Sequence, residues 1–281
     1  MPETMRNGGS RWVAALLIAG LAAPAAAGDA DEGLAKELEP GRITGQERPF
    51  AFLVDPSTPS AGRFSVGYAF GLGSGIPADR PLPVNMATAN GSHTFQVAYG
   101  ITDQLAPYAS ATLSQGSGDT STSGTSSTAT SYQVGLTWQP TRPGAPFRFS
   151  ISGAGMHEGQ GGASGLTSLA AASYDMGRLR VAGNFRADKI FATGRDAVDA
   201  FLLLGASWRT TSFLRLGAEY VGQDLEETFS SEAEGGARHA IGPTVALDLD
   251  GGRYQVAVGS GFGLTARSPR ALMRAALAFN F

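Results

Sequence analysis

The sequence predicts an all-β fold, a closed antiparallel transmembrane β-barrel of about twelve strands, with ten and fourteen as the outer bounds. Three observations predict it. Segments of about ten residues that alternate apolar with small or polar side chains recur from Phe64 onward, and tilted strands that cross a bilayer have this length. A helix that spans a bilayer needs about 18 uninterrupted apolar residues, and no stretch of the sequence reaches this length. A closed barrel is then the only structure that can cross the lipid. Only 16% of the residues are charged, against about 25% in soluble domains.

The start of the chain has the features of a secretory signal peptide. Arg6 and Arg11 precede the apolar core 12–23, and the small residues that follow predict cleavage after Ala27. We therefore expect a signal peptide at 1–27, an N-terminal region at 28–62 and the barrel at 63–281.

The N-terminal region 28–62 has two halves of different character. The first half is charged and is typical of a solvated periplasmic arm, whereas the second holds the apolar run Phe50–Val54 between prolines. Two interpretations stay open, a plug inside the barrel or a periplasmic arm with one apolar patch. A plug would weaken the case for an open channel.

Twelve segments carry the strand pattern, and the first shows it plainly. It places Phe64, Val66 and Tyr68 on one face, with Ser65 and Gly67 on the other. The twelve segments, in order, are 64–73, 92–102, 104–114, 131–139, 146–155, 166–175, 178–186, 198–208, 212–221, 238–250, 253–263 and 271–281. The alternation is weakest in 166–175, whose face is not assigned.

Two prolines, Pro107 and Pro243, fall within these segments. Proline lacks the N–H that a ladder hydrogen bond needs, so each is expected to mark a bulge or a strand end. For this reason the predicted number of strands remains between ten and fourteen.

The connections between the segments alternate in length. A long connection at 74–91 is followed by the turn Thr102–Asp103 and then by a long loop rich in Ser, Thr and Gly, and the alternation continues to the end. Transmembrane barrels have short periplasmic turns and longer external loops. An even strand count places both chain ends in the periplasm.

Aromatic residues are expected in two girdles, because rings with one apolar and one wet side favour the membrane interface. Those at the periplasmic strand ends are Trp138, Phe147, Trp208, Tyr254 and Phe281. Those at the external ends are Phe70, Phe95, Tyr132, Tyr220 and Phe262.

The chain from Phe64 to Phe281 resembles bacterial outer-membrane β-barrel proteins of porin-like architecture, and its closing LAFNF is similar to the C-terminal signature strand of that class. The resemblance is one of architecture and matches no subfamily. It implies an outer-membrane location with membrane lipid as a partner. It also implies that Leu277, Phe279 and Phe281 form a signal that the barrel assembly machinery recognises.

The inward faces carry many Gly and Ala residues, which are too small to fill a barrel of this size, so we expect free space inside. The inward charged residues are Arg148, Arg180, Arg186, Arg215, Glu219, Arg238, Asp248 and Arg274. They form either a positive wall that favours anions or arginines that brace the wall by pairing with carboxylates. Phe201 and Leu203 also face inward and predict a partly apolar or constricted lumen.

No catalytic motif surrounds His93, His157 or His239, and each is expected at an external strand end or loop. The absence of cysteine excludes disulfides and thiolate chemistry. The acidic loop near 223–236 either binds calcium or is simply solvated, and its spacing is not that of an EF-hand. No cofactor or metal is expected, and a net charge of −3 without a basic cluster argues against a nucleic-acid partner.

These observations predict a passive outer-membrane channel for small solutes, with anions among the candidates. The first alternative is a closed barrel with a structural, adhesive or assembly role carried by its external loops. A barrel hydrolase ranks last, and a soluble β-sandwich is the rival fold.

Overall fold

The structure, a computed structural model, describes residues 48–75, 91–116, 127–159, 162–191, 198–223, 225 and 237–281. Every described residue belongs to one compact unit, Pro40–Phe281. The predicted signal peptide 1–27 and the charged half of the N-terminal region lie outside the described residues.

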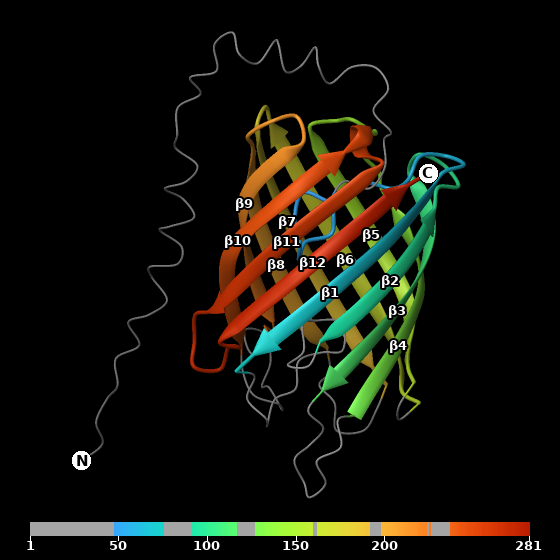
Figure 1. Ribbon diagram of the computed structural model, residues 1–281. Coiled ribbons are helices and arrows are strands. Elements are labelled where there is room, and N and C mark those ends of the chain that lie inside the picture. Colours follow the sequence, from blue (N-terminus) through green and yellow to red (C-terminus); the bar gives the residue numbers. More distant parts are fainter. Residues whose placement is uncertain are drawn as a thin grey trace, which may run out of the picture. The chain divides into compact units, whose positions relative to one another are not determined.

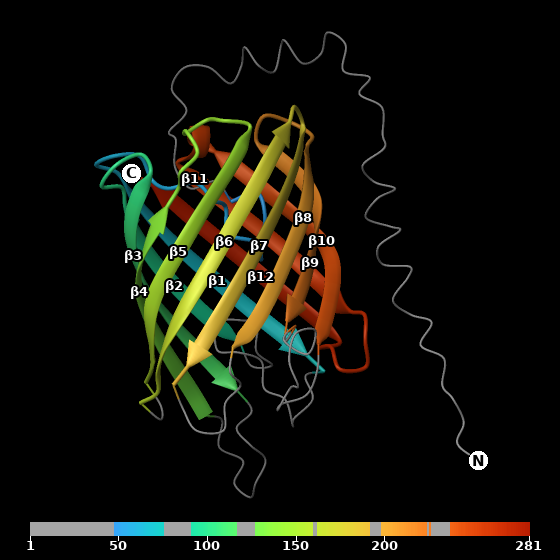
Figure 2. The same cartoon turned by 180° about the vertical axis from the view of Figure 1, so that it is seen from behind.

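The described residues form twelve antiparallel strands that close into a barrel (Figures 1 and 2). The strands are β1 Phe64–Ser74, β2 Ser92–Tyr99, β3 Leu105–Gly116, β4 Ser127–Trp138, β5 Phe147–Glu158, β6 Ser164–Met176, β7 Leu179–Ile190, β8 Asp199–Arg209, β9 Leu214–Gln223, β10 Arg238–Leu249, β11 Tyr254–Gly263 and β12 Ala271–Asn280. Each strand pairs with its neighbours in sequence, and β12 pairs with β1 to close the ring. The predicted fold class and the count of twelve are confirmed.

A 3₁₀ turn, η2 Asp250–Gly252, joins β10 to β11. In the part of the chain that the structure describes, no helix has the length and apolar character needed to cross a membrane.

Side chains alternate between the two faces of the wall, as the pleat of a strand requires. In β1, Ser65, Gly67 and Ala69 are buried inside, whereas Phe64 and Leu72 are exposed outside. The same alternation leaves large apolar side chains exposed on the outer face of every strand. An apolar outer surface of this extent suits lipid and is rare on soluble monomers.

The segment whose face the sequence left unassigned also alternates. In β6, Leu166 and Tyr174 are exposed, whereas Thr167, Ala171 and Ser173 are buried. Small residues on both faces of β6 hide this pattern in the sequence.

Both prolines lie within strands, at points where one ladder is interrupted. The ladder between β2 and β3 ends at Ala98 and Tyr108, one residue before Pro107. The ladder between β10 and β11 skips Gly242 and Pro243 without a change of register. Each proline keeps its pairing with the strand on its other side, so neither breaks the barrel.

The two ends of the barrel differ in their connections. The end that we call the turn end, at the top in Figure 1, carries the C terminus, the start of β1 and the short connections. One of these is Gly177–Arg178, where Gly177 has a φ of +62°, a left-handed conformation that glycine adopts without strain. There the Phe281 N–H donates to the Phe64 carbonyl over 2.9 Å and fastens the chain end to the first strand. We call the opposite end the loop end.

Residues 48–60, which we call the inner loop, form no strand and lie inside the barrel (Figure 1). They precede β1: the apolar run 50–53 lies in the lumen, and Thr58 is held at the turn end beside the start of β1. The apolar run 50–53 is buried in one cluster with inward side chains of β8 to β12. The second half of the predicted N-terminal region is therefore in contact with the lumen wall.

Candidate functional site

The inner loop is fastened first at the turn end, beside β1. The Gln139 side-chain oxygen accepts hydrogen bonds from the Thr58 N–H over 2.9 Å and from the Thr58 hydroxyl over 3.2 Å. The same hydroxyl lies 2.8 Å from the Asp103 carbonyl, and the Gly62 N–H donates to the Gly100 carbonyl. These bonds fix the place at which the loop leaves the lumen and joins β1.

A buried group of charges holds the loop further in. Asp55 of the loop lies 3.6 Å from Arg148 of β5 and 3.4 Å from Arg180 of β7. Both arginines also contact Asp175 of β6, at 2.9 Å and 2.5 Å, because adjacent strands bring the three side chains together. The Asp55 side chain is only 2% exposed, so the two arginines and the Ser57 N–H, 2.9 Å away, take the place of water around it.

Asn184 of β7 binds the loop backbone at Val54, the residue before Asp55. The Val54 N–H donates to its side-chain oxygen over 2.6 Å, and its side-chain N–H donates to the Val54 carbonyl over 2.9 Å. The amide group of Asn184 thus satisfies both backbone groups of Val54, as a neighbouring strand would.

Glu219 of β9 holds the innermost part of the loop. Its carboxylate accepts three consecutive backbone N–H groups, from Ala51 and Phe52 over 2.8 Å each and from Leu53 over 3.0 Å. Glu219 is 2% exposed, so these amide dipoles replace the water that would otherwise solvate its charge.

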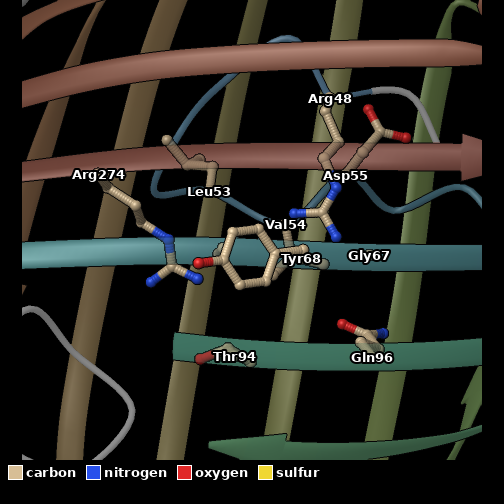
Figure 3. Close-up of a pocket in the computed structure, with 10 residues that line it drawn as sticks. Arg48, Leu53, Val54, Asp55, Gly67, Tyr68, Thr94, Gln96 and Arg274 are labelled. Atoms are coloured by element: carbon tan, nitrogen blue, oxygen red, sulfur yellow. The ribbon is translucent and has the colours of Figure 1, made fainter. Parts of the chain in front are cut away.

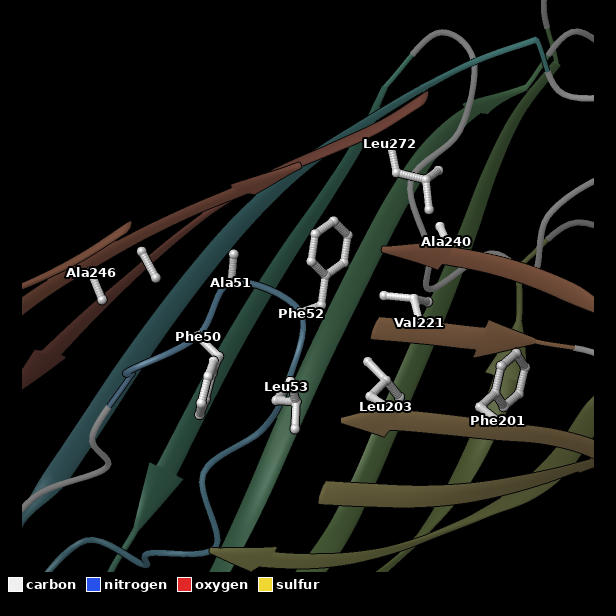
Figure 4. Close-up of a cluster of buried hydrophobic side chains, with 11 residues drawn as sticks. Phe50, Ala51, Phe52, Leu53, Phe201, Leu203, Val221, Ala240, Ala246 and Leu272 are labelled. Atoms are coloured by element: carbon white, nitrogen blue, oxygen red, sulfur yellow. The ribbon is translucent and has the colours of Figure 1, made fainter. Parts of the chain in front are cut away.

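Apolar packing completes the attachment (Figure 4). The loop contributes Phe50, Ala51, Phe52 and Leu53 to a cluster with the wall residues Phe201, Leu203, Val221, Ala240, Ala246, Ala257 and Leu272. Phe201 and Leu203 face inward as predicted, and they lie in an apolar part of the lumen.

The inward glycines make room for the loop. A Cβ atom at Gly205 would lie 2.7 Å from the Phe50 ring and 2.9 Å from Leu53, and one at Gly259 would lie 2.9 Å from the Ala51 side chain. The expectation that small inward residues leave free space is therefore wrong at these positions, because the loop fills it.

A cavity of about 60 Å³ remains between the inner loop and the wall formed by β1, β2 and β12 (Figure 3). Arg48 and Leu53 border it from the loop, Thr94 and Gln96 from β2, and Arg274 from β12. Burial is the main cause that lowers the pKa of Arg48 to about 10; the positive charge of Arg274 lowers it too, and Asp55 acts in the opposite direction.

The charged residues predicted to line the lumen lie on the inward faces of their strands, but their surroundings differ. Arg148, Arg180 and Glu219 hold the inner loop, and Arg186 is paired with Asp188. Arg274 borders the cavity. The others are Arg215, buried in β9, Arg238, buried in β10, and Asp248, half-buried in β10.

Several residues that hold the inner loop, border the cavity or pair with the predicted arginines were not identified from the sequence. They are Arg48, Asp55, Gln139, Asp175, Asn184 and Asp188. The inward parity of 178–186 could have identified Asn184, because it shares a face with Arg180 and Arg186. Nothing in the pattern around Asp55 distinguishes it from a surface carboxylate.

The aromatic residues predicted for the two girdles lie on the outer surface. Those that are exposed are Trp138, Phe147, Trp208, Tyr254 and Phe281 toward the turn end, and Phe95, Tyr132 and Phe262 toward the loop end. Phe70 and Tyr220 are half-buried. In β12, Leu277 and Phe279 are half-buried on the outward parity.

The three histidines lie toward the loop end. His93 and His239 each form a hydrogen bond with a tyrosine, Tyr68 at 2.8 Å and Tyr220 at 2.6 Å, and His157 lies 3.2 Å from the Ser164 hydroxyl. The acidic residues Asp224, Glu226, Glu227, Glu232 and Glu234 lie outside the described residues. Among the residues that the structure does describe, no group of three or more His, Asp or Glu could hold a metal ion.

Comparison with known proteins gives a structural match only. No family model and no curated protein matches the sequence. An outer-membrane channel from Pseudomonas putida F1 superposes with a TM-score of 0.54 at 13% identity, over 86% of this chain and 99% of that chain. The KdgM porin, solved in complex with disordered oligogalacturonate, superposes with a TM-score of 0.52 at 9% identity, over 77% and 99%.

At these identities the likeness concerns the fold. Both proteins are outer-membrane barrels, so the match agrees with the closed ring of strands and its apolar outer face. The chain has the fold of bacterial outer-membrane β-barrel proteins of the porin type.

Proposed function

We propose that the protein is an outer-membrane channel for small solutes whose lumen is narrowed by the inner loop. The observation that carries the proposal is the loop, which occupies the lumen and is held by side chains of β5, β7 and β9. In a barrel of about eight strands the interior side chains fill the lumen, and twelve strands enclose more space than that. Removal of the loop would leave small inward residues around an open passage.

The polar attachments of the loop are of a kind that water can replace. Glu219, Asn184 and Asp55 hold it through hydrogen bonds and ion pairs, and each of these groups is well solvated when exposed. A loop held in this way can leave the lumen without disturbing the strand ladders, which makes it suited to control passage.

The charge distribution supports a small anion as the solute. Arg148, Arg180 and Arg186 are paired with carboxylates and contribute little net charge to the passage. Arg48 and Arg274 border the cavity together with Asp55, whose carboxylate is paired with Arg148 and Arg180, so a net positive potential is concentrated there. The KdgM porin was solved with oligogalacturonate, and an anionic solute for this chain would be of a related charge class.

The proposal is tested by single-channel conductance in planar bilayers. The mature protein would be compared with a variant in which residues 50–55 are replaced by Gly and Ser. We expect low conductance from the first and larger, anion-selective steps from the second, with selectivity taken from the reversal potential in a salt gradient. The same replacement at 142–144, an exposed connection at the turn end, is the control and should behave as the mature protein.

Two results would contradict the proposal. Equal conductance with and without the loop segment would show that the loop does not restrict passage. Silence from a loop variant that is folded and inserted, as judged by circular dichroism and protease resistance, would favour a closed barrel that acts through its external loops.

A further inference from the structure

The cavity beside the inner loop brings together two cationic side chains from different parts of the chain. Arg48 belongs to the loop and Arg274 to β12, and both border the cavity with Thr94 and Gln96 of β2 (Figure 3). Gly67 of β1 makes room for this arrangement, because a Cβ atom there would lie 2.5 Å from a terminal nitrogen of Arg48.

Neither guanidinium group is fully satisfied within the described part of the protein. The Nε groups of Arg48 and Arg274 are buried there without a hydrogen-bond partner. Asp55 also borders the cavity, but its carboxylate oxygens lie within 3.6 Å of Arg148 and Arg180. Two partly desolvated cations therefore face one cavity, and their repulsion contributes to the lowered pKa of Arg48.

We propose that this cavity binds a small carboxylate anion, which joins the inner loop to the barrel wall. The two guanidinium groups would hold the carboxylate, since their planar donor pairs match its oxygens. Thr94 and Gln96 supply further donors, and Leu53 and Ala69 form an apolar surface for a short hydrocarbon tail. A volume of about 60 Å³ holds a few water-sized groups, so an acetate-sized anion fits and a sugar acid does not.

The ligand would act on the position of the loop. An anion that contacts both Arg48 and Arg274 binds fully only while the loop is inside, so it stabilises that state. At ten times its dissociation constant, such a ligand lowers the opening equilibrium of the loop about tenfold. This consequence rests on the proposed function, since a bound carboxylate would close the channel and would not be the solute that passes.

Hydrogen exchange of the mature protein in detergent micelles tests the proposal. The amides of Ala51, Phe52 and Leu53 are bonded to Glu219, so their exchange reports release of the loop. In sodium acetate we expect exchange about tenfold slower than in sodium chloride of equal ionic strength. Equal rates in the two salts would overturn the proposal, and so would equal protection by phosphate, which lacks the apolar tail.

Variants identify the site. Arg274→Gln and Gly67→Ala should each abolish the acetate effect, the second because its new methyl group displaces the flexible end of Arg48. Arg142→Gln removes one exposed positive charge from the turn end and should keep the effect. An acetate effect that survives in Arg274→Gln would show that the anion binds elsewhere.

The exchange experiment does not depend on conduction. Acetate protection in a protein that stays silent after loop replacement would leave the carboxylate site standing and overturn the channel. A loop variant that conducts, together with no acetate effect in the mature protein, would overturn the carboxylate site alone.

Discussion

Glu219 shows how one side chain can hold an irregular segment inside a barrel. A loop without secondary structure carries backbone N–H groups that lose water when they enter the lumen, and each needs an acceptor. The carboxylate of Glu219 meets this need for three successive residues. In return the amides solvate a charge that would otherwise be costly to bury.

Glu219→Gln should release the loop. A neutral amide retains one acceptor oxygen and presents donors where acceptors are needed, so we expect the free energy of loop opening to fall by about 2–3 kcal/mol. Hydrogen exchange at residues 51–53 measures this change. Asp250→Asn, at an exposed turn, is the matched control, and unchanged exchange in Glu219→Gln would contradict the role of the carboxylate.

The charges around Asp55 should behave as a coupled unit. Arg180→Gln leaves Asp55 and Asp175 with one arginine between them, and a buried carboxylate that loses a partner costs about 3 kcal/mol. We expect a lower thermal unfolding midpoint in detergent. Adding Asp55→Asn to Arg180→Gln should restore part of the loss, whereas strictly additive effects would show that the two residues do not interact.

At the scale of elements, the inner loop and the strands β8 and β11 are matched in shape. A Cβ atom at Gly205 or Gly259 would lie less than 3 Å from a loop side chain. The inward faces of β8 and β11 have glycine at these positions because the loop occupies the space that a side chain would need. Small residues inside a barrel can therefore indicate an occupant as well as an open passage.

Gly205→Val should push the loop away from the wall. The new side chain would overlap with Phe50 and Leu53, and overpacking of this kind costs about 1–3 kcal/mol. We expect the conductance of the variant to approach that of the protein with 50–55 replaced. Gly153→Val, on the outer face where a Cβ atom meets nothing within 4 Å, should leave conductance as it was; a similar change in both variants would contradict the argument.

The strands could be predicted from the sequence because their pattern is local. Alternation in 64–73 or 253–263 follows directly from the pleat and needs no knowledge of distant residues. β6 is the exception, since alanines and serines on both of its faces give little contrast.

The attachment of the loop could not be predicted in the same way. Its partners are backbone amides, which carry no signature in the sequence, and Ala51 bonds to a carboxylate 168 residues away. The inward parity placed Glu219 and Arg180 correctly inside the barrel, but it could not identify Val54 or Asp55 as near neighbours. A plug and a solvated arm have the same composition, so only the fold distinguishes them.

At the scale of the whole molecule, the ring is closed by the pairing of β12 with β1. Phe281 contributes through its backbone N–H, while its ring is exposed on the outer surface. Phe281 can therefore take part in closing the barrel through its backbone, while its ring stays available for recognition.

We propose that the barrel assembly machinery binds the Phe281 ring, and the variant Phe281→Ala then separates this role from barrel closure. The backbone bond to Phe64 remains possible, so we expect normal thermal stability of the protein that reaches the membrane but a lower amount of it. Heat-modifiable mobility of membrane fractions measures both. Phe262→Ala, an exposed ring near the loop end, is the control, and equal yields of the two variants would exclude a special role for Phe281.

The position of the inner loop ahead of β1 has a consequence for biogenesis. The loop is synthesised before every strand that holds it, and its partners on β5, β7 and β9 are in place together only when most of the sheet has formed. Contacts over such sequence separations form late in folding, because long chain segments must first be closed. Docking of the loop is thus a natural last step, and protection of its amides would distinguish a finished barrel from a partly assembled sheet.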